Sequence, residues 1–298
     1  MAHPGVDLIR SFLGDRASEV IPVEERRANL EALAGSVPPP PGVEVTELTV
    51  AGRPAERSVP VVVDGPGTVL YLHGGGYVSG SLGTHRGLAG RLALAARRPV
   101  VSLDYRLAPE HPFPAGLDDA VAAVRELQAD GPVAVAGDSA GGGLTMATLL
   151  ALRDAGGAQP VAGLCISPWV DLTQSGESHV SRSEVDPMLS AETLADMAQH
   201  YLQGQDATHP LASPVGADLA GLPPLRIDVG DAEVLLDDSV ALAERVLATS
   251  GQAELVVWPE LFHVFPGFPA EIIPESDECL EAAGAFLARH LDGADAPA

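Results

Sequence analysis

Residues 132–150 read Pro-Val-Ala-Val-Ala-Gly-Asp-Ser-Ala-Gly-Gly-Gly-Leu-Thr-Met-Ala-Thr-Leu-Leu. The apolar run at 132–136 predicts a buried strand, and the run at 144–150 predicts a helix. Between them lies a Gly-x-Ser-x-Gly motif, the pattern of a nucleophile elbow. So tight a turn needs very small flanking residues, and it lifts the hydroxyl of Ser139 toward a helix N-terminus, where negative charge is favoured. Ser139 is therefore a candidate nucleophile, provided that the rest of the chain supplies its partners.

Strand-like and helix-like segments alternate outward from this motif. Strands are expected at 43–50, 58–63, 67–72, 99–104, 132–137, 161–167, 224–230 and 253–258. Helices are expected at 84–97, 116–129, 140–155, 234–250 and 275–291. Nearly all-apolar strands that alternate with helices predict an α/β fold with a mostly parallel central sheet and helices on both faces. The short connections of the first strands suggest an antiparallel start.

Two segments stand outside this alternation. Residues 5–35 carry apolar residues at helical spacing, which predicts two short helices, and the prolines at 38–41 end that segment. Residues 170–222 are too long for a plain loop in a compact domain and include a helical stretch at Ala191–Leu202. We therefore interpret 170–222 as an insertion over the edge of the sheet.

Composition excludes several classes of function. The chain has 298 residues and a net charge of −24, which disfavours nucleic acid and anionic membranes because their phosphates would be repelled. It contains no lysine, which excludes Schiff-base chemistry and the P-loop lysine.

Cys165 and Cys279 lie in no metal-ligand spacing and are expected to be free thiols. We expect no metal and no cofactor. The N-terminus lacks the features of a signal peptide, and no apolar run is long enough to span a bilayer, so a cytoplasmic location is expected.

A serine nucleophile needs a base, usually a histidine that a carboxylate orients. In parallel sheets the active site lies at the carboxyl ends of the strands. His263 follows the last predicted strand, where the order Ser…acid…His of the α/β-hydrolases puts the base. The acid should follow the strand at 224–230. Both Asp231 and Glu233 are open at this point, whereas Asp237 and Asp238 are better explained as first-turn charges of the next helix.

The strand at 67–72 ends in His73-Gly-Gly-Gly-Tyr77. Successive glycines let backbone N–H groups turn toward a ligand without obstruction by a Cβ atom. We expect the N–H groups of Gly74 and Gly75, with that of Ala140, to form an oxyanion hole. His73 is expected to brace this loop.

Three blocks of sequence resemble the signature blocks of the bacterial hormone-sensitive-lipase-like esterases. They are His73–Gly76, the Asp104–Pro114 block (Asp-Tyr-Arg-Leu-Ala-Pro-Glu-His-Pro-Phe-Pro) and Gly137–Gly142. The resemblance runs from about residue 40 to the C-terminus. It implies an α/β-hydrolase fold and hydrolysis of carboxylic esters with short acyl chains, with the nucleophile at Ser139 and oxyanion donors at Gly74 and Gly75.

The resemblance also assigns the acid and the domains. Many members carry Asp-Pro-Leu-Arg-Asp where this chain has Glu233-Val-Leu-Leu-Asp237, and this alignment places Glu233 at the catalytic acid. It further implies cap helices at 1–40, a catalytic core at 41–169 and 223–298, and an inserted cap segment at 170–222. A homodimer through the last strand and helix is the assembly that it suggests.

The prediction is thus a serine carboxylesterase with a Ser139–His263–Glu233 triad, acting on a small ester. The alternatives are a deacetylase, lactonase or amidase with the same triad, and a non-catalytic receptor on this scaffold. The arginine of the Asp104–Pro114 block, Arg106, is expected to pair with Glu110 or a nearby carboxylate in a structural role. Three aromatic residues could line the pocket or merely pack, namely Tyr77, Trp169 and Tyr201.

Overall fold

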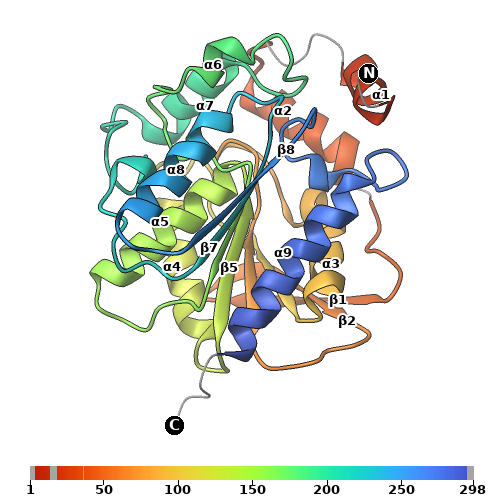
Figure 1. Cartoon of the computed structure of the whole chain (residues 1–298), viewed down its shortest axis with the longest axis vertical. Coiled ribbons are helices and arrows are strands. Elements are labelled where there is room, and N and C mark those ends of the chain that lie inside the picture. Colours follow the sequence, from red (N-terminus) through yellow and green to blue (C-terminus); the bar gives the residue numbers. More distant parts are fainter. Residues whose placement is uncertain (1–3, 14–18, 36, 294–298) are drawn as a thin grey trace.

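The computed structural model describes residues 4–13, 19–35 and 37–293 (Figure 1). Eight strands form a single sheet in the order β1-β2-β4-β3-β5-β6-β7-β8. Their bounds are β1 Val43–Val50, β2 Arg53–Pro60, β3 Thr68–Leu72, β4 Val100–Leu103, β5 Val133–Asp138, β6 Gly163–Ile166, β7 Leu225–Gly230 and β8 Ala253–Trp258. The pairs β1–β2 and β2–β4 are antiparallel, and every other pair is parallel. The predicted mostly parallel sheet with an antiparallel start is confirmed.

Helices cover both faces of the sheet (Figure 1). Helices α3 and α9 lie on one face, and α4, α5 and α8 lie on the other. Their bounds are α3 Leu82–Ala96, α4 Ala115–Leu127, α5 Ala140–Asp154, α8 Leu236–Ala248 and α9 Glu275–Asp292. Side chains alternate across the strands, so Val69 and Tyr71 of β3 pack toward α3 and α9, while Leu70 and Leu72 join the other layer. The central parallel strands are therefore buried between two layers of helices.

The predicted second strand, 58–63, is wrong in its position. The structure places β2 at Arg53–Pro60, and the following residues, Val61–Val63, are exposed. Ala51 and Gly52 both adopt positive φ angles, +49° and +78°, which form the tight hairpin that joins β1 to β2. The strand begins in polar sequence because it lies near the edge of the sheet, where one face contacts water. Neither Ala51 nor this polar start resembles the usual sequence signal of a hairpin.

The remaining helices gather at one end of the molecule. They are α1 Pro4–Leu13, α2 Val23–Leu30, α6 Ser178–Ser181 and α7 Ala191–Leu202, and a π-helical turn, Glu31–Gly35, continues α2. Short 3-10 turns lie at Pro214–Gly216 and Phe265–Gly267. The two helices predicted within 5–35 are confirmed, and α7 has the predicted bounds. Residues 1–3, 14–18 and 36 of the predicted segment 1–40 lie outside the described residues.

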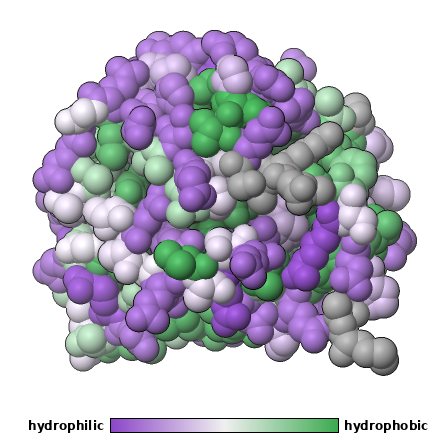
Figure 2. Space-filling model, turned by 90° about the horizontal axis from the view of Figure 1, so that it is seen from above, coloured by the Kyte–Doolittle hydropathy of each residue, from purple (hydrophilic) through white to green (hydrophobic). Residues whose placement is uncertain are grey.

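Seen from this end, the molecule is mostly hydrophilic, with small separate hydrophobic patches (Figure 2). No helix in the described part of the chain combines the length and the apolar character needed to cross a bilayer.

Candidate active site

Ser139 stands on a strained turn between β5 and α5. Its backbone angles are φ +54° and ψ −122°, a region that residues other than glycine rarely adopt. A Cβ atom on Gly137 would overlap the carbonyl group of Gly141, and one on Gly141 would overlap the carbonyl oxygen of Leu72. Both glycines are therefore required for the turn to pass so close to β3. The hydroxyl of Ser139 is thereby held at the end of the sheet, as the motif predicts.

His263 and Glu233 form a buried hydrogen-bonded pair. The Nδ1 atom of His263 lies 2.7 Å from Oε2 of Glu233. The other carboxylate oxygen, Oε1, accepts hydrogen bonds from the Ser167 hydroxyl at 2.8 Å and from the backbone N–H of Gly230 at 2.7 Å. Glu233 is fully buried, and His263 is nearly so. With both oxygens engaged, the carboxylate holds one orientation of the imidazole ring, with Nε2 left for another partner.

The other acidic candidates near Glu233 have separate partners. Asp231 accepts a hydrogen bond from the backbone N–H of Glu260 at 2.7 Å. Asp237 accepts from the backbone of Ser178, and Asp238 bonds the backbone of Val170 and Asp171 and the ring of His179. The structure therefore brings Glu233, and not Asp231, to His263.

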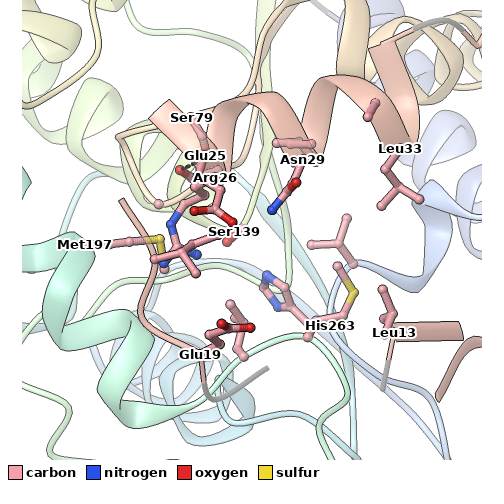
Figure 3. Close-up of a pocket in the computed structure, with 18 of the residues that line it drawn as sticks. Leu13, Glu19, Glu25, Arg26, Asn29, Leu33, Ser79, Ser139, Met197 and His263 are labelled. Atoms are coloured by element: carbon pink, nitrogen blue, oxygen red, sulfur yellow. Dashed lines mark hydrogen bonds between the residues drawn. The ribbon is translucent and has the colours of Figure 1, made fainter. Parts of the chain in front are cut away.

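Ser139 and His263 line the same cavity, whose volume is about 760 Å³ (Figure 3). No hydrogen bond joins the two side chains within the described part of the chain, although catalytic hydrogen bonds often tighten only when substrate binds. Residues of α1, α2 and the π-helical turn form the wall opposite Ser139, including Leu13, Asn29 and Leu33 respectively. The N-terminal helices therefore enclose the space in which Ser139 would meet a substrate.

Asp186, which the sequence did not single out, lies beside the pair. Its carboxylate oxygens accept from the backbone N–H of Val234 at 3.0 Å and of Met188 at 2.8 Å, so it ties the 170–222 segment to the loop of Glu233. Burial raises the pKa of Asp186 to about 6, and the negative Glu233 adds to the rise, while His263 opposes it. No spacing rule could have linked a residue 47 positions before Glu233 to the Glu233–His263 pair.

The electrostatics around His263 favour its protonated form. Burial alone would lower the pKa of His263, but the hydrogen bond and charge of Glu233 raise it. The carboxylates of Asp186 and Asp138 add to this effect, and the net result is a pKa above the ordinary value. An imidazole in this environment accepts a proton more readily than one in water.

The glycine loop corrects one expectation. The N–H of Gly74 donates to Oδ1 of Asp138 at 3.0 Å, so it is not directed at Ser139. Gly75 and Gly76 line the cavity instead, and their φ angles are +118° and +65°, which are accessible to glycine. Within the described residues, no hydrogen bond uses the N–H of Gly75, Gly76 or Ala140. The sequence pattern did not identify Gly76 as a candidate donor, because three consecutive glycines do not show which of their N–H groups face the cavity.

Asp138 anchors the loop from below. Besides Gly74, its carboxylate accepts from the hydroxyl of Tyr71 at 2.6 Å, and it lies 3.4 Å from Nε2 of His85. Burial would raise the pKa of Asp138, but His85 and the Tyr71 hydrogen bond outweigh burial and lower it. Asp138 therefore stays ionised and continues to accept the hydrogen bond from the N–H of Gly74 in the glycine loop.

His73 braces the same loop, as expected. Its ring stacks on Tyr105 with 4.4 Å between centroids, and its Nδ1 atom lies 2.8 Å from the carbonyl oxygen of Gly74. Burial lowers the pKa of His73 to about 4, and the neighbouring His85 adds to the decrease. His73 is therefore neutral near pH 7.

The remaining sequence candidates are structural. Arg106 pairs with Asp119 at 2.8 Å, whereas Glu110 pairs with Arg27 of α2. Three aromatic side chains pack against one another and are not among the residues that line the cavity, namely Tyr77, Trp169 and Tyr201.

Both cysteines are buried free thiols. Among the described residues, no group of three or more His, Cys, Asp or Glu side chains is arranged to hold a metal ion.

Comparison with known proteins places this geometry in a family. A family model of the alpha/beta hydrolase fold matches residues 69–267. An acetyl-hydrolase of Streptomyces hygroscopicus is 44% identical over 295 residues, which cover 96% of this chain and 97% of that protein. An esterase of the bacterial hormone-sensitive lipase family has a crystal structure with a TM-score of 0.92 and 42% identity, covering 97% of this chain and 98% of that one. Another esterase, whose crystal was soaked with p-nitrophenyl butyrate, is 39% identical with a TM-score of 0.92, over 97% of this chain and 99% of that one.

Proposed function

Because this chain belongs to the α/β-hydrolase family, and within it to the bacterial hormone-sensitive-lipase-like esterases, we propose that it hydrolyses short-chain carboxylic esters through an acyl-enzyme on Ser139. The observation that carries the proposal is the buried Glu233–His263 pair, which shares one cavity with a serine on a strained elbow. A receptor would not need these costly features, because strain and buried charge are retained where chemistry uses them.

The reaction follows from the positions of these groups. The Nε2 atom of His263 takes the proton from the Ser139 hydroxyl, and the Oγ atom of Ser139 forms a bond to the carbonyl carbon of the ester. The bond to the alcohol oxygen then breaks as His263 returns the proton to that oxygen. Water repeats both steps on the acyl-enzyme and releases the acid. Throughout, Glu233 stabilises the imidazolium through its 2.7 Å hydrogen bond.

We propose that the oxyanion is held by the N–H groups of Gly75, Gly76 and Ala140. The first two line the cavity, and Ala140 begins α5 directly after the nucleophile, so its N–H is free of helical hydrogen bonding. Each such donor typically stabilises the transition state by about 2.7–4 kcal/mol.

We also propose that the segments 1–40 and 170–222 act together as a cap. Side chains from both line the cavity, among them Leu33 from the first and Met188 and Met197 from the second. Closing the site in this way would exclude water from the acyl-enzyme until the alcohol has left.

The acyl preference is tested with p-nitrophenyl esters of increasing chain length. Each buried CH₂ group contributes about 0.8 kcal/mol only when it meets apolar surface. Here Glu19, Glu25 and Arg26 interrupt the apolar wall. We therefore expect kcat/KM to be highest for the acetate or butyrate and to fall toward the decanoate. A steady rise to the decanoate would contradict the short-chain preference.

The pH dependence of kcat/KM follows from the state of His263. Only neutral imidazole can take the proton of Ser139, so activity should rise with pH through the pKa of His263. Since Glu233 raises that pKa, the acid limb should lie above the ordinary histidine value. In Glu233→Gln, burial still lowers the pKa of His263, but the carboxylate that raises this pKa is gone. The acid limb of the kcat/KM profile should therefore move to lower pH. An unmoved limb would show that another group controls it.

Removal of acetyl groups is a second candidate activity, which the acetyl-hydrolase relative favours. The same triad can cleave an ester or an amide, and the leaving group decides between them. The ratio of kcat/KM for p-nitrophenyl acetate to that for p-nitroacetanilide measures this directly. A ratio near unity would identify an amide-cleaving deacetylase.

A further inference from the structure

Arg26 of α2 is the arginine that lines the catalytic cavity in the described part of the chain, and it reaches from the helix toward the side that holds Ser139 (Figure 3). The next residue, Arg27, has a structural role. Its guanidinium bonds the carbonyl oxygens of Val78 and Ala108 and both carboxylate oxygens of Glu110. Arg27 thus fastens α2 to the core, and Arg26 is not needed for that purpose.

The guanidinium of Arg26 lacks hydrogen bonds. Its Nε and Nη2 atoms are buried and form no hydrogen bond, and within the described part of the chain its Nη1 atom forms none either. The nearest carboxylate oxygen, Oδ2 of Asp196 in α7, lies 3.9 Å from Nη2, which is close enough for an ion pair but beyond hydrogen-bonding distance, and this oxygen accepts no hydrogen bond itself. Burial lowers the pKa of Arg26, and the attraction of Asp196 only partly offsets this. A largely buried guanidinium whose Nε and Nη2 donors form no hydrogen bond is costly unless a ligand binds it.

The free edge of Arg26 has a defined chemical preference. The Nε and Nη2 atoms of an arginine form two parallel donors that match the two oxygens of a carboxylate or phosphate. In several other arginines of the described residues this edge binds a carboxylate. Examples are the pairs Arg86–Glu56, Arg106–Asp119 and Arg226–Asp228.

We propose that Arg26 binds an anionic oxygen group of the substrate, so that the preferred esters carry a carboxylate or a similar oxyacid group away from the scissile bond. This inference rests on the proposed esterase function, whose substrate class it narrows. Asp196 is the competing counter-ion, and an incoming anion would take its place beside Arg26. Two exposed carboxylates, Glu19 and Glu25, also line the cavity, but water screens them more than it screens the largely buried guanidinium. The buried carboxylate of Asp138 lines the cavity too, but its charge is already engaged by Tyr71, Gly74 and His85.

The test uses two matched pairs of probes. On the acyl side, mono-p-nitrophenyl adipate is compared with its neutral methyl ester. On the alcohol side, p-acetoxybenzoate is compared with methyl p-acetoxybenzoate. The quantity measured is the discrimination ratio, which is kcat/KM for the anionic probe divided by kcat/KM for the neutral one. Arg26→Gln should lower this ratio about tenfold or more in one pair, as expected for loss of a hydrogen bond between charged groups. The affected pair identifies the side of the ester that carries the anion.

Two further variants separate recognition from structure. Asp196→Asn removes the competing charge and should raise the ratio in the same pair. Arg27→Gln disturbs the anchoring of α2 and should change both probes of a pair alike, leaving the ratio as it was. An unchanged ratio for Arg26→Gln in both pairs would overturn the inference. Failure of the esterase function would look different, because the wild-type protein would then turn over none of the four probes.

Discussion

The Ser139→Ala variant should turn over p-nitrophenyl butyrate at least ~10³-fold more slowly than the wild-type protein, as is typical when a triad nucleophile is removed. Alanine should preserve the elbow between β5 and α5, so the substitution removes only the oxygen that attacks the ester. Initial rates at saturating substrate measure the effect. Unfolding in urea should show a midpoint close to that of the wild type.

A second hydroxyl in the cavity provides the matched control. Ser79 lines the same space, and its Oγ donates to the carbonyl oxygen of Gly75 at 2.8 Å. Ser79→Ala removes one ordinary hydrogen bond, so a loss of less than about tenfold is expected. If Ser139→Ala kept more than a tenth of wild-type turnover, Ser139 would not be the nucleophile.

Glu233→Gln should cost about 10²–10⁴-fold in kcat, the range expected when the orienting carboxylate of a triad loses its charge. Glutamine has nearly the shape of glutamate but cannot stabilise the imidazolium. It also presents an amide NH₂ group toward either Nδ1 of His263 or the donors from Ser167 and Gly230. The measurement is kcat for p-nitrophenyl butyrate, with folding checked by urea unfolding.

Asp231→Asn is the matched control, since Asp231 also follows β7 and bears the same charge. Its carboxylate bonds the backbone N–H of Glu260 and does not contact His263 among the described interactions. We expect less than about a tenfold loss, the effect of one hydrogen bond. A larger loss for Asp231→Asn than for Glu233→Gln would reverse the assignment of the acid.

Much of the fold could be predicted because buried parallel strands are apolar runs that stand out between helices. The predicted boundaries of β3 to β8 differ from the observed ones by at most two residues. The first antiparallel hairpin was harder, since β2 lies near the edge of the sheet and begins in polar sequence. Its turn depends on the positive φ of Ala51, which is not a residue that usually indicates such a turn.

The candidate site was predictable where a motif fixes the local backbone, as at Ser139, and where chain order fixes the strand end, as at His263. It was not predictable where long-range packing decides. The carboxylate of Asp138 takes the N–H of Gly74 and so moves the candidate oxyanion donors along the loop. Likewise, Asp186 and Arg26 reach the site from segments outside the core, and neither belongs to a motif.

Labelling with a fluorophosphonate tests the central claim most directly, because the probe phosphonylates only a serine whose hydroxyl is activated. Intact mass and peptide mapping should find one equivalent of the label, attached at Ser139, in parallel with the loss of esterase activity. The Ser139→Ala variant should remain unlabelled. Esterase activity that persists without labelling, or a label attached to a different serine, would contradict the assignment of Ser139 as the nucleophile.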